Sequence, residues 1–135
     1  MALQWSETVR NAWLDNLEST VGTSAVLKIR TGAQPASVAT ADSGTVLATL
    51  NLPSDWMSAA SGGSKAKTGT WSDTSADNTG TAAHWRLYAS NGTTCHAQGS
   101  VTATGGGGDM TLDTVSIVAA GTVTVTAFTL TAPGA

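Results

Sequence analysis

Two histidines are the residues of this chain best suited to binding a metal or moving a proton. If His84 and His96 pair across a predicted hairpin, both imidazoles would share one face of a sheet. A zinc site needs about four ligands, or three and a water. Asp73 or Asp77 would have to complete it, and no spacing motif supports that set. We therefore expect both histidines to lie on the sheet surface, and we expect no bound metal.

The single cysteine stands next to one of these histidines. A cysteine nucleophile needs its base facing it, with a third group that orients the base. Cys95 and His96 are neighbours on a predicted strand, so their side chains point to opposite faces and cannot form that pair. We expect Cys95 to be a small buried residue. One cysteine also excludes an internal disulfide framework.

Four consecutive glycines at residues 105–108 could cradle a phosphate. Such a loop opens onto a helix N-terminus and often carries a Lys-Ser or Lys-Thr pair. Here Asp109 and Met110 follow the glycines and lead into strand-like sequence. We interpret the run as a flexible loop between strands, which would settle when a neighbouring subunit arrives.

The carboxylates of the chain do not form a recognisable pair. Most aspartates stand beside Gly, Ser, Asn or Thr, where the capping of turns explains them. A sugar-cleaving pair needs two convergent acids in a cleft, and the stretch DTSADNTG lacks the twelve-residue EF-hand pattern. We expect no catalytic residue and no cofactor, and we expect that the protein is not an enzyme.

Composition limits the classes of partner. The 135 residues are 41% hydrophobic and only 11% charged, against about 25% charged in an average soluble protein. The net charge is −3, and the six basic residues are dispersed, so we expect no nucleic-acid binding. No apolar run approaches the length of a membrane span, and the N-terminus shows no signal pattern, so we expect no membrane association and synthesis in the cytoplasm. A surface so poor in charge suggests that partners cover much of it.

Residues 1–22 are predicted to form an N-terminal helical arm. Ser6 can cap the helix, Glu7 suits its positive end, and Gly22 can stop it. The apolar positions at helical spacing are Val9, Trp13 and Leu17, flanked by Leu14 and Val21. We expect this stripe to pack on the protein's own sheet, with docking on a partner as the alternative.

Residues 23–135 are predicted to form an all-β domain, because the hydrophobic period changes to two after Gly22. Asn91 and Gly92 predict a two-residue hairpin turn in which both residues have positive φ. A change of phase in the last strand predicts a β-bulge near Ala127. About eight strands with short turns predict a β-sandwich, specifically a jelly roll in two sheets, with the helix outside it.

Five tryptophans offer the clearest hint of binding. Trp13 and Trp85 fall on predicted core faces, while Trp5, Trp56 and Trp71 fall at element ends or in loops. An exposed tryptophan is a frequent anchor at interfaces. The candidate partner-binding residues are Trp5, Trp13, Trp56 and Trp71.

Three stretches of the chain resemble small structural proteins of tailed bacteriophages. They are LKIRTGAQPASVATADSGTVLATLNLP, GTAAHWRLYASNGTTCHAQGSV and GGGGDMTLDTVSIVAAGTVTVTAFTLTAPGA, which together cover most of residues 24–133. The likeness lies in strands rich in Thr, Ala and Gly and carries no catalytic motif.

The resemblance implies a virion structural protein similar to the capsid cement or decoration proteins. Such a protein would bind between major capsid subunits on the capsid surface and stabilise the head, with copies of itself as further partners in a trimer or dimer. The alternative is a module of the tail or fibre, either structural or a receptor binder that stacks glycans on Trp56 or Trp71.

Overall fold

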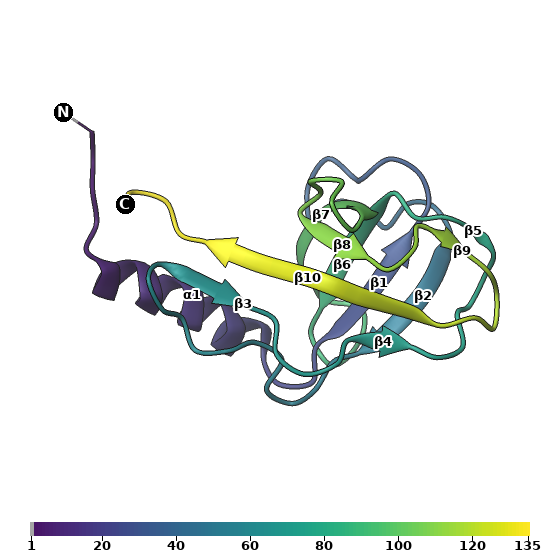
Figure 1. The fold of residues 1–135 in the computed structure, drawn as a ribbon, viewed down its shortest axis with the longest axis horizontal. Helices are drawn as coiled ribbons and strands as arrows, with labels where there is room; N and C mark the ends of the chain where they lie inside the picture. The colour runs from purple at the N-terminus through teal and green to yellow at the C-terminus, as the bar shows by residue number, and fades with distance from the viewer. Residues whose placement is uncertain (1) are drawn as a thin grey trace.

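The structure, a computed structural model, describes residues 2–135 and shows a mainly β protein with one N-terminal helix (Figure 1). The elements in chain order are α1 (Glu7–Val21), β1 (Val26–Arg30), β2 (Val46–Asn51), β3 (Ser64–Ala66), β4 (Ser72–Asp73), β5 (Gly80–Thr81), β6 (His84–Tyr88), β7 (Cys95–Ala103), β8 (Met110–Leu112), β9 (Ser116–Ile117) and β10 (Val123–Thr131).

Eight strands form one mixed sheet that curls into a half-barrel. The strand order is β2-β1-β6-β7-β8-β10-β3, with β4 also paired to β10, and β5 and β9 form a separate two-stranded sheet. The nine-residue β10 crosses the half-barrel and continues out of it to β3, where α1 lies (Figure 1). The predicted β-rich fold with a leading helix is confirmed, but this order does not clearly give the two facing sheets of a jelly roll.

The predicted hairpin joins β6 and β7, although its turn differs from the predicted one. Gly92 has a φ of 71°, but Asn91 does not have positive φ, and the loop runs from Ala89 to Thr94. The Asn91 side chain accepts from the backbone N–H groups of Thr93 and Thr94, which closes this longer turn. The predicted bulge in the last strand is confirmed, because the register of β10 on β8 shifts between Val125 and Ala127.

The glycine run makes a reversal that few other sequences allow. β7 and β8 pair in parallel, with Val101 opposite Met110, and only residues 104–109 connect them. Parallel neighbours ordinarily need a crossover of a dozen or more residues. The loop folds tightly on Thr102, because a Cβ on Gly106 would lie 2.7 Å from the Thr102 Cβ and one on Gly108 would lie 2.9 Å from the Thr102 N. The glycines therefore have a structural reason to be there.

Helix α1 has the predicted ends and buries part of the predicted apolar face. The Ser6 hydroxyl accepts from the Val9 N–H at 3.2 Å, and Gly22 ends the helix with positive φ. Leu14 and Val21 are buried and Leu17 packs against the core, whereas Val9 and Trp13 are exposed. The expectation that Val9 and Trp13 face the sheet is wrong, because polar contacts fix the orientation of this helix.

Candidate functional site

A row of polar side chains attaches α1 to the rest of the protein. Each member accepts a hydrogen bond from a backbone N–H of the segment before β3, at 2.8–3.1 Å. The four pairs are Glu7 with Gly62, Asn11 with Gly63, Asp15 with Ala60 and Glu18 with Met57. Residues 7, 11, 15 and 18 repeat at helical spacing, so the sequence contained a signal for this row that the search for apolar stripes missed.

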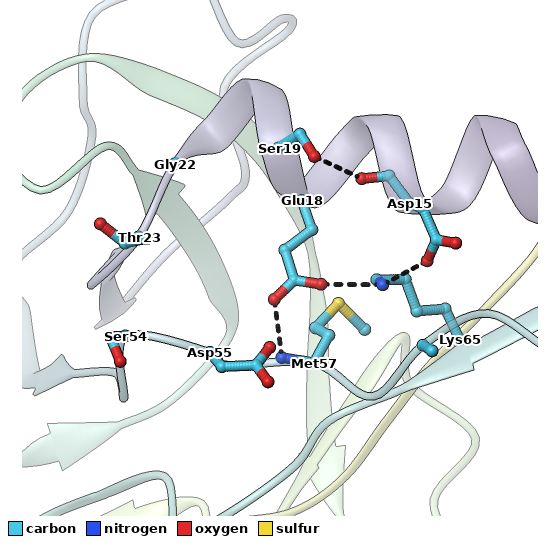
Figure 2. A pocket seen from close by; sticks show the side chains of 10 residues that line it. Asp15, Glu18, Ser19, Gly22, Thr23, Ser54, Asp55, Met57 and Lys65 are labelled. Atoms are coloured by element: carbon cyan, nitrogen blue, oxygen red, sulfur yellow. Dashed lines mark hydrogen bonds and ion pairs between the residues drawn. The ribbon is translucent and has the colours of Figure 1, made fainter.

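A buried lysine completes the attachment (Figure 2). The Lys65 ammonium lies 2.7 Å from Asp15 and 2.8 Å from Glu18, and it donates to the Ser58 carbonyl at 2.9 Å. Burial disfavours the charged form of Lys65, but the bonds to both carboxylates outweigh that cost and raise its pKa. The bond from Lys65 and that from the Ala60 N–H lower the pKa of Asp15. We name Asp15, Glu18 and Lys65 the lysine cluster.

The polar attachment leaves apolar side chains of the helix in solvent. At 100° per residue, Val9 and Trp13 lie on the side of α1 opposite the polar row. Trp13 and Trp5 are each 42% exposed, and their rings meet edge to face with centroids 5.2 Å apart. Trp5, which precedes α1, forms a partly exposed apolar patch with Val9 and Trp13, and the Trp5 ring also lies against Gly134. We name this patch the outer face of α1.

The other two tryptophan candidates lie inside the protein. Trp56 is 0% and Trp71 is 1% exposed, and their indole N–H groups donate to the carbonyls of Gly22 and Thr68. Trp71 packs 5.7 Å from Phe128, centroid to centroid. The expectation that loops expose Trp56 and Trp71 is wrong, since both rings fill the core between β10 and the helix end. Partner binding through Trp5 and Trp13 stays a prediction.

A second charged group holds the loop of residues 31–45 against β1 and β6. Asp42 accepts from Arg30 at 2.9 Å, from Arg86 at 2.8 Å and from the Tyr88 hydroxyl at 2.7 Å. Arg30 and Arg86 are 6% and 1% exposed, whereas the Asp42 side chain is 40% exposed. Burial and the bond to Asp42 raise the pKa of Tyr88 to about 12. We name Arg30, Asp42, Arg86 and Tyr88 the arginine cluster.

The residues considered for metal or proton chemistry do not converge. His84 lies opposite Ser100 rather than His96, and His96 is exposed. His84 is 1% exposed, so its predicted place on the surface is wrong, and its Nδ1 bonds to the Gly32 carbonyl at 2.9 Å. Burial chiefly lowers the pKa of His84, and the charges of Arg30 and Arg86 act in the same direction. Within residues 2–135, no three His, Cys, Asp or Glu side chains are grouped so that they could hold a metal ion.

Cys95 is half-buried, and its sulfur has two hydrogen-bond partners. Its sulfur accepts from the Arg86 Nε at 3.2 Å, and its thiol points toward the Ala97 carbonyl at 3.4 Å. The predicted loop aspartates also have structural partners, since Asp73 and Asp77 both accept from Thr49. Each of these groups is accounted for by the packing of loops on the sheet.

The hollow beside the lysine cluster has a volume of about 460 Å³ (Figure 2). It lies between the C-terminal half of α1 and residues 54–59, and Asp15, Glu18 and Lys65 line it. Because these three charges satisfy one another, the hollow presents no unpaired cation to an anionic ligand. We therefore place the candidate site on the outer face of α1 and not in this hollow.

Comparison with protein-family models, with curated proteins and with solved structures found no match for this chain. The one helix in residues 2–135 is too short and too polar to cross a membrane.

Proposed function

We propose that this chain is a structural protein of a tailed-bacteriophage virion that binds between major capsid subunits and stabilises the head. The observation that supports this most is the outer face of α1. Its two tryptophans are held in an edge-to-face pair by a helix that is itself fixed to the protein, so little side-chain freedom is lost on binding. Paired, exposed aromatic side chains are typical anchors of protein interfaces.

The rest of the molecule supports a binding role over a chemical one. The lysine and arginine clusters hold the main groups of charged side chains in contact with one another. Their charges pair with one another and attach α1 and the loop of residues 31–45 to the sheet. The resemblance of residues 24–133 to phage structural proteins is the basis for proposing a phage particle as the location and the major capsid protein as the partner. The proposal does not depend on a jelly roll, which is the fold of some of the phage proteins that the sequence resembles.

Immunogold electron microscopy of intact virions with an antibody to this chain tests the location. We expect gold over the heads. Gold confined to the tail would overturn the capsid proposal and favour a tail or fibre module. A glycan-binding version of that alternative would have to use Trp5 and Trp13, because Trp56 and Trp71 are buried.

Binding of purified protein to particles that lack it tests the surface. We expect Trp13→Ala to weaken binding at least about tenfold, the loss typical of an interface anchor. Val118→Ala is the matched control, because Val118 is 63% exposed and lies away from α1. Equal binding by both variants would show that the outer face of α1 is not the contact.

A further inference from the structure

The curled sheet has a hollow between β7 and β10 beside the short strand β8. β8 is only three residues long, so it separates β7 from β10 over residues 101–103 and 125–128 alone. Next to the Met110 end of β8, a hollow of about 410 Å³ lies between residues 97–98 of β7 and residues 128–130 of β10. We name this hollow the slot. Its walls are Ala97, Gln98, Asp109, Thr129 and Leu130, and its apolar base is Trp85 and Phe128, whose ring centroids are 5.3 Å apart.

Both walls of the slot carry backbone groups without a strand partner in residues 2–135. The Ser100 N–H points to this side and donates to the Asp109 carboxylate, so the N–H and C=O of Gln98, two residues away, point to it as well. On β10, the backbone groups of Phe128 and Ala132 form hydrogen bonds on the side of β3. The backbone N–H and C=O of Thr129 therefore point to the opposite side, into the slot. The indole N–H of Trp85 is also buried without a partner.

This arrangement defines the chemistry of an occupant. Strands lie about 4.8 Å apart, and β8 occupies the space between β7 and β10 at the end of the slot. An extended peptide that continues the position of β8 could therefore bond to both walls. An apolar side chain on the inward face of that peptide would meet Trp85, Phe128 and Leu130. A small ligand with a single polar group would leave the backbone of one wall unpaired.

The chain contains a segment of this kind at residues 2–4. It is exposed and irregular, and it runs away from the half-barrel (Figure 1). The Gln4 side-chain amide donates to the Ala135 carbonyl at 3.3 Å, and backbone bonding begins at Trp5, whose N–H donates to the Gly134 carbonyl at 2.8 Å. Leu3 is 73% exposed, more than any other large apolar side chain in residues 2–135.

The position of Trp5 fixes where the protein's own residues 2–4 lie. Trp5 is bound at Gly134, four residues beyond Leu130, and Leu3 is two residues from Trp5. In this arrangement Leu3 is 73% exposed and does not line its own slot. The slot is therefore open to a segment of another copy.

We propose that residues 2–4 of a second copy of this chain insert into the slot as an added strand, with Leu3 seated against Trp85, Phe128 and Leu130. This inference rests on the self-association included in the proposed function and gives it a mechanism. The inserted backbone pairs with Gln98 on one side and Thr129 on the other.

Sedimentation velocity of the full chain over a concentration series tests the role of Leu3. We expect the natural protein and Val118→Ser to associate, and Leu3→Ser to remain monomeric. Both substitutions remove one exposed apolar side chain, and only Leu3→Ser changes the segment of residues 2–4. Association of Leu3→Ser to the same extent as the natural protein would overturn the proposal, and so would a natural protein that is monomeric throughout.

Disulfide trapping between differently tagged copies tests the contact itself. In a Cys95→Ser background, Leu3→Cys protein mixed with Ala97→Cys protein should form a crosslink between the two copies, because insertion brings the Cα atoms within about 7 Å. Val118→Cys mixed with Ala97→Cys is the control and should not crosslink. Equal crosslinking of the two mixtures would overturn the proposal.

The outcomes separate this proposal from the proposed function. If Leu3→Ser associates normally and gold still covers the heads, arm insertion is wrong and the capsid role stands. If Leu3→Ser abolishes association but the protein never binds particles, arm insertion stands and the capsid role is wrong.

Discussion

The lysine and arginine clusters attach two different segments to the half-barrel with the same kind of interaction and the opposite balance of charge. In the lysine cluster, one buried cation meets two carboxylates of α1, whose side chains are 49% and 17% exposed. In the arginine cluster, two buried cations of the sheet meet one carboxylate of the loop, which is 40% exposed. In both, the cation is the buried partner and the acid keeps some contact with water.

This difference decides what happens when one partner is lost. A buried charge left without its counterion costs much more than an exposed one, because the exposed charge is solvated by water. Removal of the single acid of the arginine cluster leaves two buried guanidinium groups. Removal of the single cation of the lysine cluster leaves two carboxylates that are partly exposed to water and still accept backbone hydrogen bonds. We therefore expect loss of the acid from the arginine cluster to destabilise the fold more than loss of the cation from the lysine cluster.

The largest effect is expected for Asp42→Ala. Arg30 and Arg86 keep carbonyl acceptors in the loop but lose their carboxylate, and Tyr88 loses its acceptor. We expect the free energy of unfolding to fall by about 2–3 kcal/mol, below the ~3–5 kcal/mol of a fully buried pair, because Asp42 is partly solvated. Urea denaturation measures the loss.

Asp55→Ala is the control for this substitution, because Asp55 is an exposed aspartate outside both clusters. We expect its change to stay within about 0.5 kcal/mol. Equal losses for the two variants would show that Asp42 does not hold the loop to the sheet.

A smaller effect is expected for Lys65→Met. The substitution keeps the buried alkyl chain and removes the cation together with its desolvation cost, while Asp15 and Glu18 still accept from the backbone of residues 57–60. We expect a loss of about 1 kcal/mol in the free energy of unfolding. Hydrogen exchange should show faster opening of α1 with little change in β1 and β6. A loss greater than that of Asp42→Ala would contradict the distinction between the two clusters.

Local sequence patterns predicted the elements of this fold better than its surfaces. Ser6 as the cap of α1, the hairpin at Gly92 and the bulge before Ala127 were all predictable, because each depends on residues close together in the chain. The parallel pairing of β7 with β8 was not, since a glycine run by itself does not specify a reversal onto Thr102.

Which faces are buried depended on partners remote in sequence. Trp85 was correctly predicted to face the core, but local sequence could not reveal that the opposite face of β6 is covered as well. The Asp42 that pairs with Arg86 on that face is 44 residues away. In α1, the apolar stripe predicted a buried Trp13. Hydrogen bonds from the backbone of residues 57–63 instead selected the polar side of the helix. The candidate site exists because of that selection, and hydrophobic periodicity alone pointed away from it.

The smallest effect is expected from mild acid, which should weaken the arginine cluster before the lysine cluster. The folded pKa of His84 lies below its ordinary value of 6.5, so the folded protein binds fewer protons than the unfolded chain. The stability that depends on neutral His84 is complete above about pH 6.5 and decreases as the pH falls below that value. Asp15, whose pKa is lowered from 3.8, contributes stability that is lost only at pH values below 3.8.

Thermal unfolding at pH 7.5 and pH 5.5 separates these contributions. We expect the natural protein to be less stable at pH 5.5, with most of the difference absent in His84→Asn, whose amide can still donate to the Gly32 carbonyl. His96→Asn is the matched control, because His96 is exposed and should leave the difference unchanged. If His84→Asn retained the full difference, protonation beside Arg30 and Arg86 would not be its cause, and the arginine cluster would tolerate a third positive charge.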